Sequence, residues 1–319
     1  MLAVTIAKSN LNFIRYPRFK ELHKEIQRCQ ELSKTSLEPQ CMSLEGESGA
    51  GKSTLVKDYT GMFPRYESEK GLTIPVFYAE IPSPATVKST ASALLEQLGD
   101  PGANKGTLWS MNSRLVGLLK ACKVELVILD EFSNLIDTDT NHVLTTVSDW
   151  LKMLIKQTGV PFLVVGIDGK VSRILKANNQ LSRLFACREK IEPFVWDGEA
   201  NIKNFSKFIQ YAELAVELPL TTEVPKVEML YRIFYATDGV VGNIMNLMRY
   251  AGLSAKEHER KTIELKDLSE AFRQRISEYL ENKVNPFVNG ANESFSPPTS
   301  KPKDYLNKRI DISNTLTTR

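Results

Sequence analysis

The residues with the clearest chemical task lie in a glycine-rich stretch that fits the pattern G-x-x-x-x-G-K-[ST] from Gly46 to Ser53. Its glycines let the backbone curl so that several N–H groups point inward, an arrangement that binds phosphate oxygens. Lys52 places a positive charge on the β- and γ-phosphates, and the Ser53 hydroxyl is a ligand for Mg²⁺. The pattern therefore predicts a nucleotide-binding phosphate loop made of Gly46, Glu47, Ser48, Gly49, Ala50, Gly51, Lys52, Ser53 and Thr54.

The segments on either side of the phosphate loop match what its chemistry requires. Residues 41–44 form a short apolar run that predicts a strand, and residues 54–59 predict a helix. A helix that begins at the loop directs the positive end of its dipole at the bound anion. The alternative is a Gly- and Ser-rich surface turn that matches the pattern by chance, and the two flanking elements argue against it.

A second motif is the unbroken apolar run 126–129, which ends in Asp130 and Glu131. Such a run is typical of a strand buried on both faces of a parallel sheet, and the acids then lie at its carboxyl end, where open α/β sheets bind ligands. Asp130 can hold Mg²⁺, directly or through water, and Glu131 can orient and activate an attacking water. The alternative is a strand that ends in a charged turn. The two motifs in this order predict hydrolysis of ATP or GTP.

The bulk properties exclude several classes of protein. No apolar run in the 319 residues approaches the length of a membrane span, and the amino-terminal residues do not resemble a signal peptide. With no membrane span, no membrane partner is expected. The four cysteines form no C-x-x-C pair and predict reduced thiols in a cytoplasmic protein; they are Cys29, Cys41, Cys122 and Cys187. The three histidines are scattered and predict no metal site.

The net charge of +3 comes from the end of the chain. Residues 283–319 hold six Lys or Arg against three Asp or Glu, so the rest of the chain is balanced. A uniformly basic nucleic-acid binder is excluded, and any such site must be local.

The pattern of elements predicts an α/β fold with a central parallel sheet, a helical lid and a flexible tail. We expect an amino-terminal arm and helix at 1–38, the nucleotide-binding core at 39–198, the lid at 199–284 and a basic tail at 285–319. The strands of the core are expected at 42–44, 75–80, 126–130, 162–165 and 190–194, with helices that include 87–97, 112–122 and 143–157. The lid helices are expected at 200–216, 226–237, 243–255 and 265–281.

The order of these parts resembles the AAA+ ATPases, and within them the TniB/TnsC family of transposition regulators, from about residue 14 to residue 255. The resemblance rests on residues 14–17, the phosphate loop, the Asp130–Glu131 pair, the strand 161–166, and the segments 180–185 and 237–244. In that family the ATPase assembles on double-stranded DNA as a ring or a filament. It links a target-selection protein of the TniQ type to transposase subunits, including in CRISPR-associated transposons.

The resemblance implies roles for several further residues. Arg183 stands where AAA+ proteins place a finger arginine that reaches the nucleotide of the neighbouring subunit, with Arg188 as the second choice and a plain surface arginine as the alternative. Asp168 lies near the position of a polar sensor of the nucleotide, or else it caps the next helix. Tyr16 is expected either to pack on the adenine or to belong to the core.

DNA binding is expected at residues 101–124, which hold basic residues and no acid. One such segment per subunit, repeated in a ring or filament, would follow the phosphate backbone without reading bases; the candidates are Lys105, Arg114, Lys120 and Lys123. The alternative is an ordinary solvated basic face. In the tail, basic residues beside the apolar cluster at 305–312 suggest a segment that folds on a partner, with a solubilising tail as the alternative. The family resemblance implies that this partner is a transposase subunit.

The leading hypothesis is an ATP-dependent assembly factor for DNA transposition, with slow, regulatory hydrolysis. The first alternative is a replication initiator or helicase loader, against which no winged-helix or helix-turn-helix pattern follows the lid. The second is a remodeller or signalling switch that acts without DNA. Against a remodeller, Trp109 is not followed by the glycine of a substrate-threading loop.

Overall fold

The chain divides into two compact units in a computed structural model that describes residues 15–69, 71–136, 140–277, 280 and 283–288. The sheet unit spans Pro17–Glu192, and the helical unit comprises Met1–Tyr16 together with Pro193–Arg319. No helix in the described ranges is both long and apolar enough to cross a membrane.

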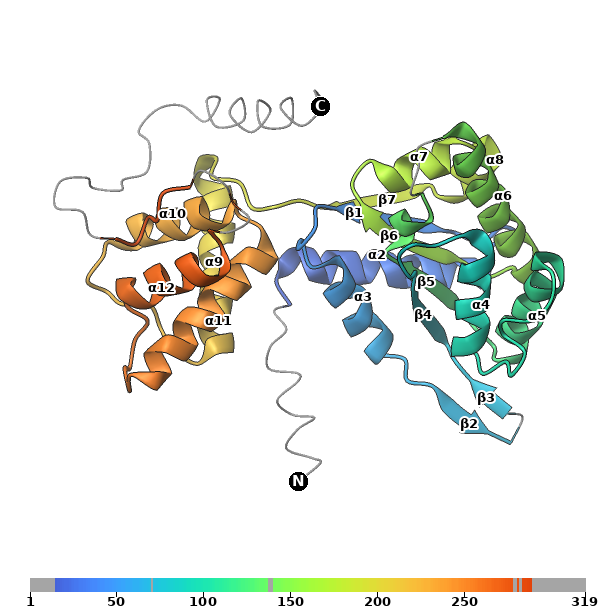
Figure 1. Ribbon diagram of the computed structural model, residues 1–319, viewed down its shortest axis with the longest axis horizontal. Coiled ribbons are helices and arrows are strands. Elements are labelled where there is room, and N and C mark those ends of the chain that lie inside the picture. Colours follow the sequence, from blue (N-terminus) through green and yellow to red (C-terminus); the bar gives the residue numbers. More distant parts are fainter. Residues whose placement is uncertain (1–14, 70, 137–139, 278–279, 281–282, 289–319) are drawn as a thin grey trace. The chain divides into compact units, whose positions relative to one another are not determined.

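Strands and helices alternate through the sheet unit (Figure 1). Its strands are β1 (Met42–Gly46), β2 (Tyr66–Ser68), β3 (Gly71–Thr73), β4 (Val76–Glu80), β5 (Leu126–Asp130), β6 (Phe162–Ile167) and β7 (Cys187–Ile191). Its helices are α2 (Pro17–Ser33), α3 (Lys52–Gly61), α4 (Val87–Gln97), α5 (Leu108–Ala121), α6 (Asn141–Thr158), α7 (Lys170–Lys176) and α8 (Asn179–Leu184), with the short 3₁₀-helix η1 (Phe132–Leu135).

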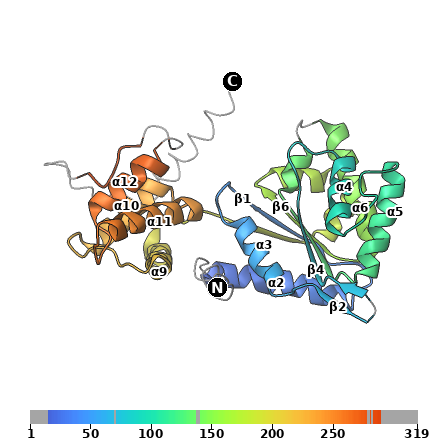
Figure 2. The same cartoon turned by 60° about the horizontal axis from the view of Figure 1, so that its bottom comes forward.

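A parallel sheet in the order β4-β5-β6-β1-β7 forms the centre of the described part of the sheet unit. Every residue of β1 and β5 is buried, as expected for strands covered on both faces. Figures 1 and 2 show α2 and α3 on one side of this sheet and α4, α5 and α6 on the other. The α/β fold with a central parallel sheet is therefore confirmed.

The core beneath α4, α5 and α6 shows why the strands have two buried faces. Alternate residues of neighbouring strands, such as Phe77 and Ala79 on β4 and Val127 and Leu129 on β5, pack into one cluster with these helices. The intervening strand residues point to the face that α2 and α3 cover, because successive side chains of a strand alternate between faces. This alternation decides which side chains near the site can meet.

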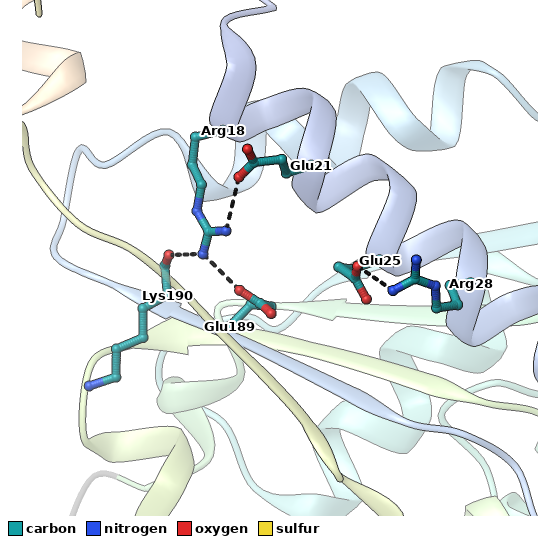
Figure 3. Close-up of polar contacts among 6 residues, drawn as sticks. All are labelled: Arg18, Glu21, Glu25, Arg28, Glu189 and Lys190. Atoms are coloured by element: carbon teal, nitrogen blue, oxygen red, sulfur yellow. Dashed lines mark hydrogen bonds and ion pairs between the residues drawn. The ribbon is translucent and has the colours of Figure 1, made fainter. Parts of the chain in front are cut away.

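The edge strand β7 corrects one expectation. A strand was expected at 190–194, whereas β7 begins at Cys187 and ends at Ile191. The strand carries three consecutive charged residues, and α2 contacts it through polar groups: one terminal nitrogen of Arg18 donates to Glu189 Oε2 at 2.7 Å and to the Lys190 carbonyl at 3.0 Å (Figure 3). Because this edge strand has no continuous apolar run, the prediction followed the apolar residues after it and placed the strand too late in the sequence.

The helical unit contains α9 (Gly198–Val216), α10 (Lys226–Thr237), α11 (Val241–Glu257) and α12 (Leu265–Arg275). Three of these lie within two residues of the expected bounds at each end, but α12 ends at Arg275 rather than at 281. Aromatic rings fill the space between α9, α10 and the entering chain; they belong to Tyr16, Phe194, Trp196, Phe205, Phe208, Tyr231 and Phe234.

Residues 283–288 belong to the helical unit, although the flexible tail was expected to begin at residue 285. Phe287 is buried and packs against Phe272, and the buried Arg232 donates to the Pro286 carbonyl at 2.6 Å. The Lys283 ammonium donates to Asp238 Oδ1 at 2.6 Å. These contacts anchor the segment on α10 and α12; the basic residues and the apolar cluster expected in the tail lie outside the described residues.

Candidate functional site

The phosphate loop, residues 46–54, joins the end of β1 to the start of α3. Gly49 and Gly51 have φ angles of 76° and 93°, a left-handed backbone that glycine adopts without strain. At Gly46 the chain approaches β7 so closely that a Cβ atom would lie 2.6 Å from the Ile191 carbonyl oxygen. The loop therefore needs glycine for two reasons, backbone conformation and close packing.

Lys52, the first residue of α3, folds back over the phosphate loop. Its ammonium is nearly buried and donates to the carbonyl oxygens of Gly46 at 3.0 Å and Glu47 at 2.8 Å. Burial lowers the pKa of Lys52, and the nearby carboxylates of Glu131 and Asp130 oppose that shift. The Lys52 ammonium is thus held at the bend of the loop by two backbone carbonyls. A phosphate group can replace these carbonyls as the acceptor.

Asp130 and Glu131 lie at the same edge of the sheet as the phosphate loop. Because β6 pairs with both β1 and β5 in parallel, the carboxyl ends of all three strands meet there. Asp130 is fully buried, and its two oxygens accept hydrogen bonds from the Glu131 N–H at 2.9 Å and the Tyr78 hydroxyl at 3.0 Å. Glu131 is half-exposed and has a left-handed backbone, with φ 53°.

The donor set of this edge fits Mg²⁺ with a nucleotide. Magnesium prefers oxygen ligands and retains waters, and a buried carboxylate with free lone pairs supplies such a ligand. Ser53 and Thr54 lie in the first turn of α3, Ser53 half-buried and Thr54 exposed. Asp130, Ser53 and the glycine-rich backbone are therefore the groups that would hold the ion and the phosphates.

Asp168 begins the turn between β6 and α7, beside the phosphate loop. Its N–H donates to the Gly46 carbonyl at 3.3 Å, and its Oδ1 pairs with the Lys190 ammonium at 2.7 Å. The residue that precedes α7 is Gly169, and the side chain that accepts its N–H belongs to Glu45. The Asp168 carboxylate therefore does not cap α7.

The two candidate finger arginines differ in their surroundings. Arg183 projects from α8 with 78% of its side chain exposed, and its nearest acid is Glu38 at 4.0 Å. Arg188 donates to the Phe185 carbonyl at 3.0 Å and to the Ser182 hydroxyl at 2.6 Å, so it ties the end of α8 to β7. Arg183 is the one with a guanidinium available to another molecule.

Tyr16 is placed in the aromatic core of the helical unit. Its ring centroid lies 5.8 Å from that of Phe194 and 5.3 Å from that of Phe208, and the residue is buried. This is the core position that stood as the alternative to an adenine contact. Residue 14, which the family resemblance includes, lies outside the described residues.

The four candidate DNA-binding residues do not form one patch. Arg114 holds the loop at 100–106 through Asp100 Oδ2 at 2.7 Å and the carbonyls of Gly102 and Lys105 at 2.9 and 3.0 Å. Lys105 is exposed at the tip of that loop, whereas Lys120 lies in the last turn of α5, about 18 Å along the helix axis from its start. Lys123 precedes the amino end of β5, opposite the edge that carries Asp130.

Two side chains that the sequence analysis did not single out lie beside the site and fix the elements that support it. Tyr78 reaches Asp130 from the neighbouring strand β4, and Glu45 reaches α7 from the strand that leads into the phosphate loop. A tyrosine or glutamate in a strand has no local signature of such a role. The signal lies in the pairing of the strands, which the sequence alone does not give.

Comparisons with known proteins agree with this geometry. Residues 6–193 match the family described as "TniB: Bacterial TniB protein". No curated protein sequence matches the chain.

Among solved structures, the ORC1 protein of Aeropyrum pernix, solved in complex with DNA, is 16% identical with a TM-score of 0.57, over 82% of this chain and 66% of that one. Cdc6p from Pyrobaculum aerophilum is 13% identical with a TM-score of 0.58, over 82% and 68%. The ORC2 protein of Aeropyrum pernix, in ADPNP–ADP complexes, is 18% identical with a TM-score of 0.53, over 79% and 67%.

The chain spans about two thirds of the length of these structures, and at such identities the likeness concerns the fold. That fold is the AAA+ P-loop fold, as expected from the sequence. The family match covers more than half of the chain, and it contains the phosphate loop, the Asp130–Glu131 pair and Arg183. The chain therefore belongs to the TniB family.

Proposed function

We propose that the chain is an ATPase that assembles on double-stranded DNA in an ATP-dependent way and links target selection to transposase recruitment in DNA transposition. The observation that carries this proposal is the meeting of the phosphate loop and the Asp130–Glu131 pair at one edge of the sheet. Membership of the TniB family supports the transposition role.

In this proposal the cofactors are ATP and Mg²⁺, and the ion would supply positive charge that offsets the charge of the phosphates. The backbone N–H groups of the phosphate loop bind phosphate oxygens, and Lys52 moves its donors from the loop carbonyls to the same oxygens. Ser53 and Asp130 are the residues that would hold the ion. Glu131 orients the attacking water and takes up its proton.

A homo-oligomer, either a ring or a helical filament, completes the site in this proposal. The Arg183 side chain is largely exposed and makes a 4.0 Å surface pair with the exposed Glu38, so its guanidinium is available to stabilise charge on a nucleotide held by a neighbouring copy. An arginine supplied by a neighbour makes hydrolysis depend on assembly. The nucleotide then acts as a population switch: the ATP state favours assembly, and hydrolysis favours disassembly.

Double-stranded DNA is the proposed support for this assembly, and the family suggests the other partners. Lys105, exposed on a loop that Arg114 fixes, is the first choice for a contact to phosphate. Transposase subunits and a target selector of the TniQ type, including one in a CRISPR-associated transposon, are proposed from membership of the TniB family. The bacterial cytoplasm is the matching location.

Negative-stain electron microscopy of the protein with duplex DNA tests the proposal. The samples contain a non-hydrolysable ATP analogue, ADP, or no nucleotide, and they compare wild type with Lys52→Ala. Lys57→Ala is the matched control, because Lys57 lies on the same helix but its ammonium pairs with the exposed Glu80 at 3.4 Å. Rings or filaments on DNA are expected with the ATP analogue in wild type and Lys57→Ala, and not in Lys52→Ala.

Single copies under every condition would reject assembly and favour a switch that acts without DNA. Where assemblies form, stimulation of a transposase separates the proposed role from that of a replication initiator or helicase loader. DNA-bound assemblies that stimulate no transposase would favour the latter.

A further inference from the structure

Glu45 is a buried carboxylate next to the phosphate loop that the proposed reaction does not use. It is the residue before Gly46 and is only 2% exposed. Its Oε2 accepts the Gly169 N–H at 2.7 Å, and its Oε1 accepts the Ser172 hydroxyl. Burying a carboxylate is costly unless hydrogen bonds compensate, so these two bonds fix Glu45 to the first turn of α7.

The turn between β6 and α7 contacts the phosphate loop a second time. The Gly46 carbonyl accepts the Asp168 N–H at 3.3 Å and the Lys52 ammonium at 3.0 Å. Asp168 and Gly169 are adjacent, so one turn is bonded to both Glu45 and Gly46. The Gly46 carbonyl therefore accepts hydrogen bonds both from this turn and from the phosphate-binding Lys52.

The edge strand β7 closes this cluster. Lys190 lies opposite Glu45 in the β1–β7 pairing, and its ammonium pairs with Asp168 Oδ1 at 2.7 Å. The hydrogen bond with Asp168 raises the pKa of Lys190, and the charge of Glu45 contributes in the same direction. Two carboxylates and one ammonium thus hold β1, β7 and the β6–α7 turn together.

The segment beyond this turn carries Arg183. Val171, Ile174 and Leu175 bury one face of α7 in the core, and α8 begins after the Asn178 side chain caps its first N–H groups. The two short helices pack on each other and on α6. A displacement at the first turn of α7 therefore moves a packed segment as a whole, because such segments do not deform continuously.

We propose that Glu45 is a positioning residue that couples the nucleotide state of the phosphate loop to the α7–α8 segment, and through it to Arg183. The inference rests on the proposed function. When Lys52 turns its donors toward phosphate oxygens, the Gly46 carbonyl loses the ammonium and keeps the Asp168 amide, and the β6–α7 turn adjusts. Glu45 passes that adjustment to α7, which lies over the opposite face of the sheet from α3.

Hydrogen exchange of the full-length protein tests the coupling, with and without a non-hydrolysable ATP analogue. In wild type, the analogue should slow exchange in residues 168–184 by about fivefold or more, the lower range of allosteric coupling. Glu45→Gln keeps the shape and one acceptor, and Ser172→Ala removes one bond. Both should bind the analogue as wild type does and lose most of this nucleotide-dependent difference. Glu189→Gln is the matched control, because that carboxylate faces Arg18 on α2.

The exchange measurement distinguishes coupling by Glu45 from a role in which Glu45 only stabilises the start of α7. If Glu45 only stabilises α7, Glu45→Gln raises exchange in α7 equally with and without the analogue, and a retained fivefold difference overturns the proposal. Fluorescent-nucleotide binding is measured on the same samples. A wild type that binds no nucleotide overturns the proposed function and the coupling together, whereas intact binding with unchanged coupling in both variants overturns only the role of Glu45.

Discussion

The Tyr78 hydroxyl donates a hydrogen bond to Asp130 Oδ2 across 3.0 Å. The two residues lie diagonally on adjacent strands, because Tyr78 is opposite Ile128 and Asp130 is opposite Glu80 in the β4–β5 pairing. Burial, followed by the charge of Asp130, raises the pKa of Tyr78 far above its ordinary value. The phenol therefore remains a neutral donor at any working pH and holds one oxygen of the carboxylate in place.

Tyr78→Phe should weaken metal use without removing nucleotide binding. The change leaves the ring but releases Asp130 Oδ2, so the carboxylate loses its fixed orientation toward the ion. Loss of a hydrogen bond to a charged group costs about 1.5–3 kcal/mol. We expect half-maximal hydrolysis to need about tenfold more Mg²⁺, as 1.4 kcal/mol corresponds to a tenfold change. ATP affinity without Mg²⁺ should stay at the wild-type value.

Tyr66→Phe is the matched control for this measurement, because Tyr66 is exposed on β2 and its removal should leave the Mg²⁺ dependence unchanged. Identical magnesium titrations of wild type and Tyr78→Phe would show that the hydrogen bond plays no part in metal use.

Glu131→Gln should bind ATP with normal affinity and hydrolyse it about 100-fold more slowly or worse, because an amide cannot take up the proton of the attacking water. Assemblies on DNA should therefore persist with ATP itself. Phosphate release and electron microscopy measure the two effects. Glu125→Gln, next to the amino end of β5 and bonded to Gln30, should behave as wild type. Assembly of Glu131→Gln that is no better than wild type would refute the population switch.

Arg183→Ala should lose hydrolysis and keep its stability, whereas Arg188→Ala should lose stability. Arg183 makes only a 4.0 Å surface pair, so its loss should leave the melting temperature unchanged and lower hydrolysis in the assembled state by about 10³-fold. Arg188 ties the end of α8 to β7, and its loss should cost about 1 kcal/mol of unfolding free energy. Thermal unfolding and assembled-state turnover measure both. Unchanged turnover in Arg183→Ala would remove it as the finger.

Lys105→Ala and Arg114→Ala should both weaken DNA binding, for different reasons. Lys105 is exposed, so its loss should reduce the slope of log affinity against log salt by about 1 without altering the fold. Arg114 anchors the loop, so Arg114→Ala should increase hydrogen exchange at residues 100–106. A salt titration in which Lys105→Ala matches wild type would exclude the contact.

The same loop should respond to acid through Asp100. The hydrogen bond from Arg114 lowers the pKa of Asp100 in the folded protein. The resulting stabilisation is complete above the pKa of an unfolded aspartate, about 3.9, and is lost as the pH falls through the lower folded value. Exchange at residues 100–106 should thus be independent of this group at neutral pH and should rise only in acid. A rise that is equal in Arg114→Ala would show that the pair is not its cause.

The parts of the fold and site that could be predicted from the sequence are those marked by patterns of consecutive residues. The phosphate loop and the strand ending at Asp130 are read from consecutive residues, because glycine conformation and full strand burial leave local marks. The edge strand β7 was misplaced because its charged side chains find partners outside the strand: Glu189 pairs with Arg18 on α2, and Lys190 pairs with Asp168. The hairpin of β2 and β3 was missed for a related reason, since its short strands are largely exposed.

The contacts among distant residues were beyond reach of the sequence alone. Tyr78 and Glu45 take their roles from strand register, and one residue of slippage would turn either side chain to the other face. Arg114 was counted as a free cation because the acid-free window began at residue 101, one position after the aspartate that binds it. A count of charges within a sequence window misses an acid outside the window that folds next to a basic residue inside it.

The left-handed backbone of Glu131 lowers thermal stability at the residue that turnover requires. A non-glycine residue with φ 53° carries a conformational cost of about 1 kcal/mol, which the rest of the sheet unit must outweigh. Glu131→Gly removes that strain together with the carboxylate, so the inactive protein is expected to melt no earlier than the active one. A screen that ranks variants by heat resistance alone would therefore retain variants that have lost the catalytic base, and thermostabilised forms of this chain have to be selected with turnover as a second criterion.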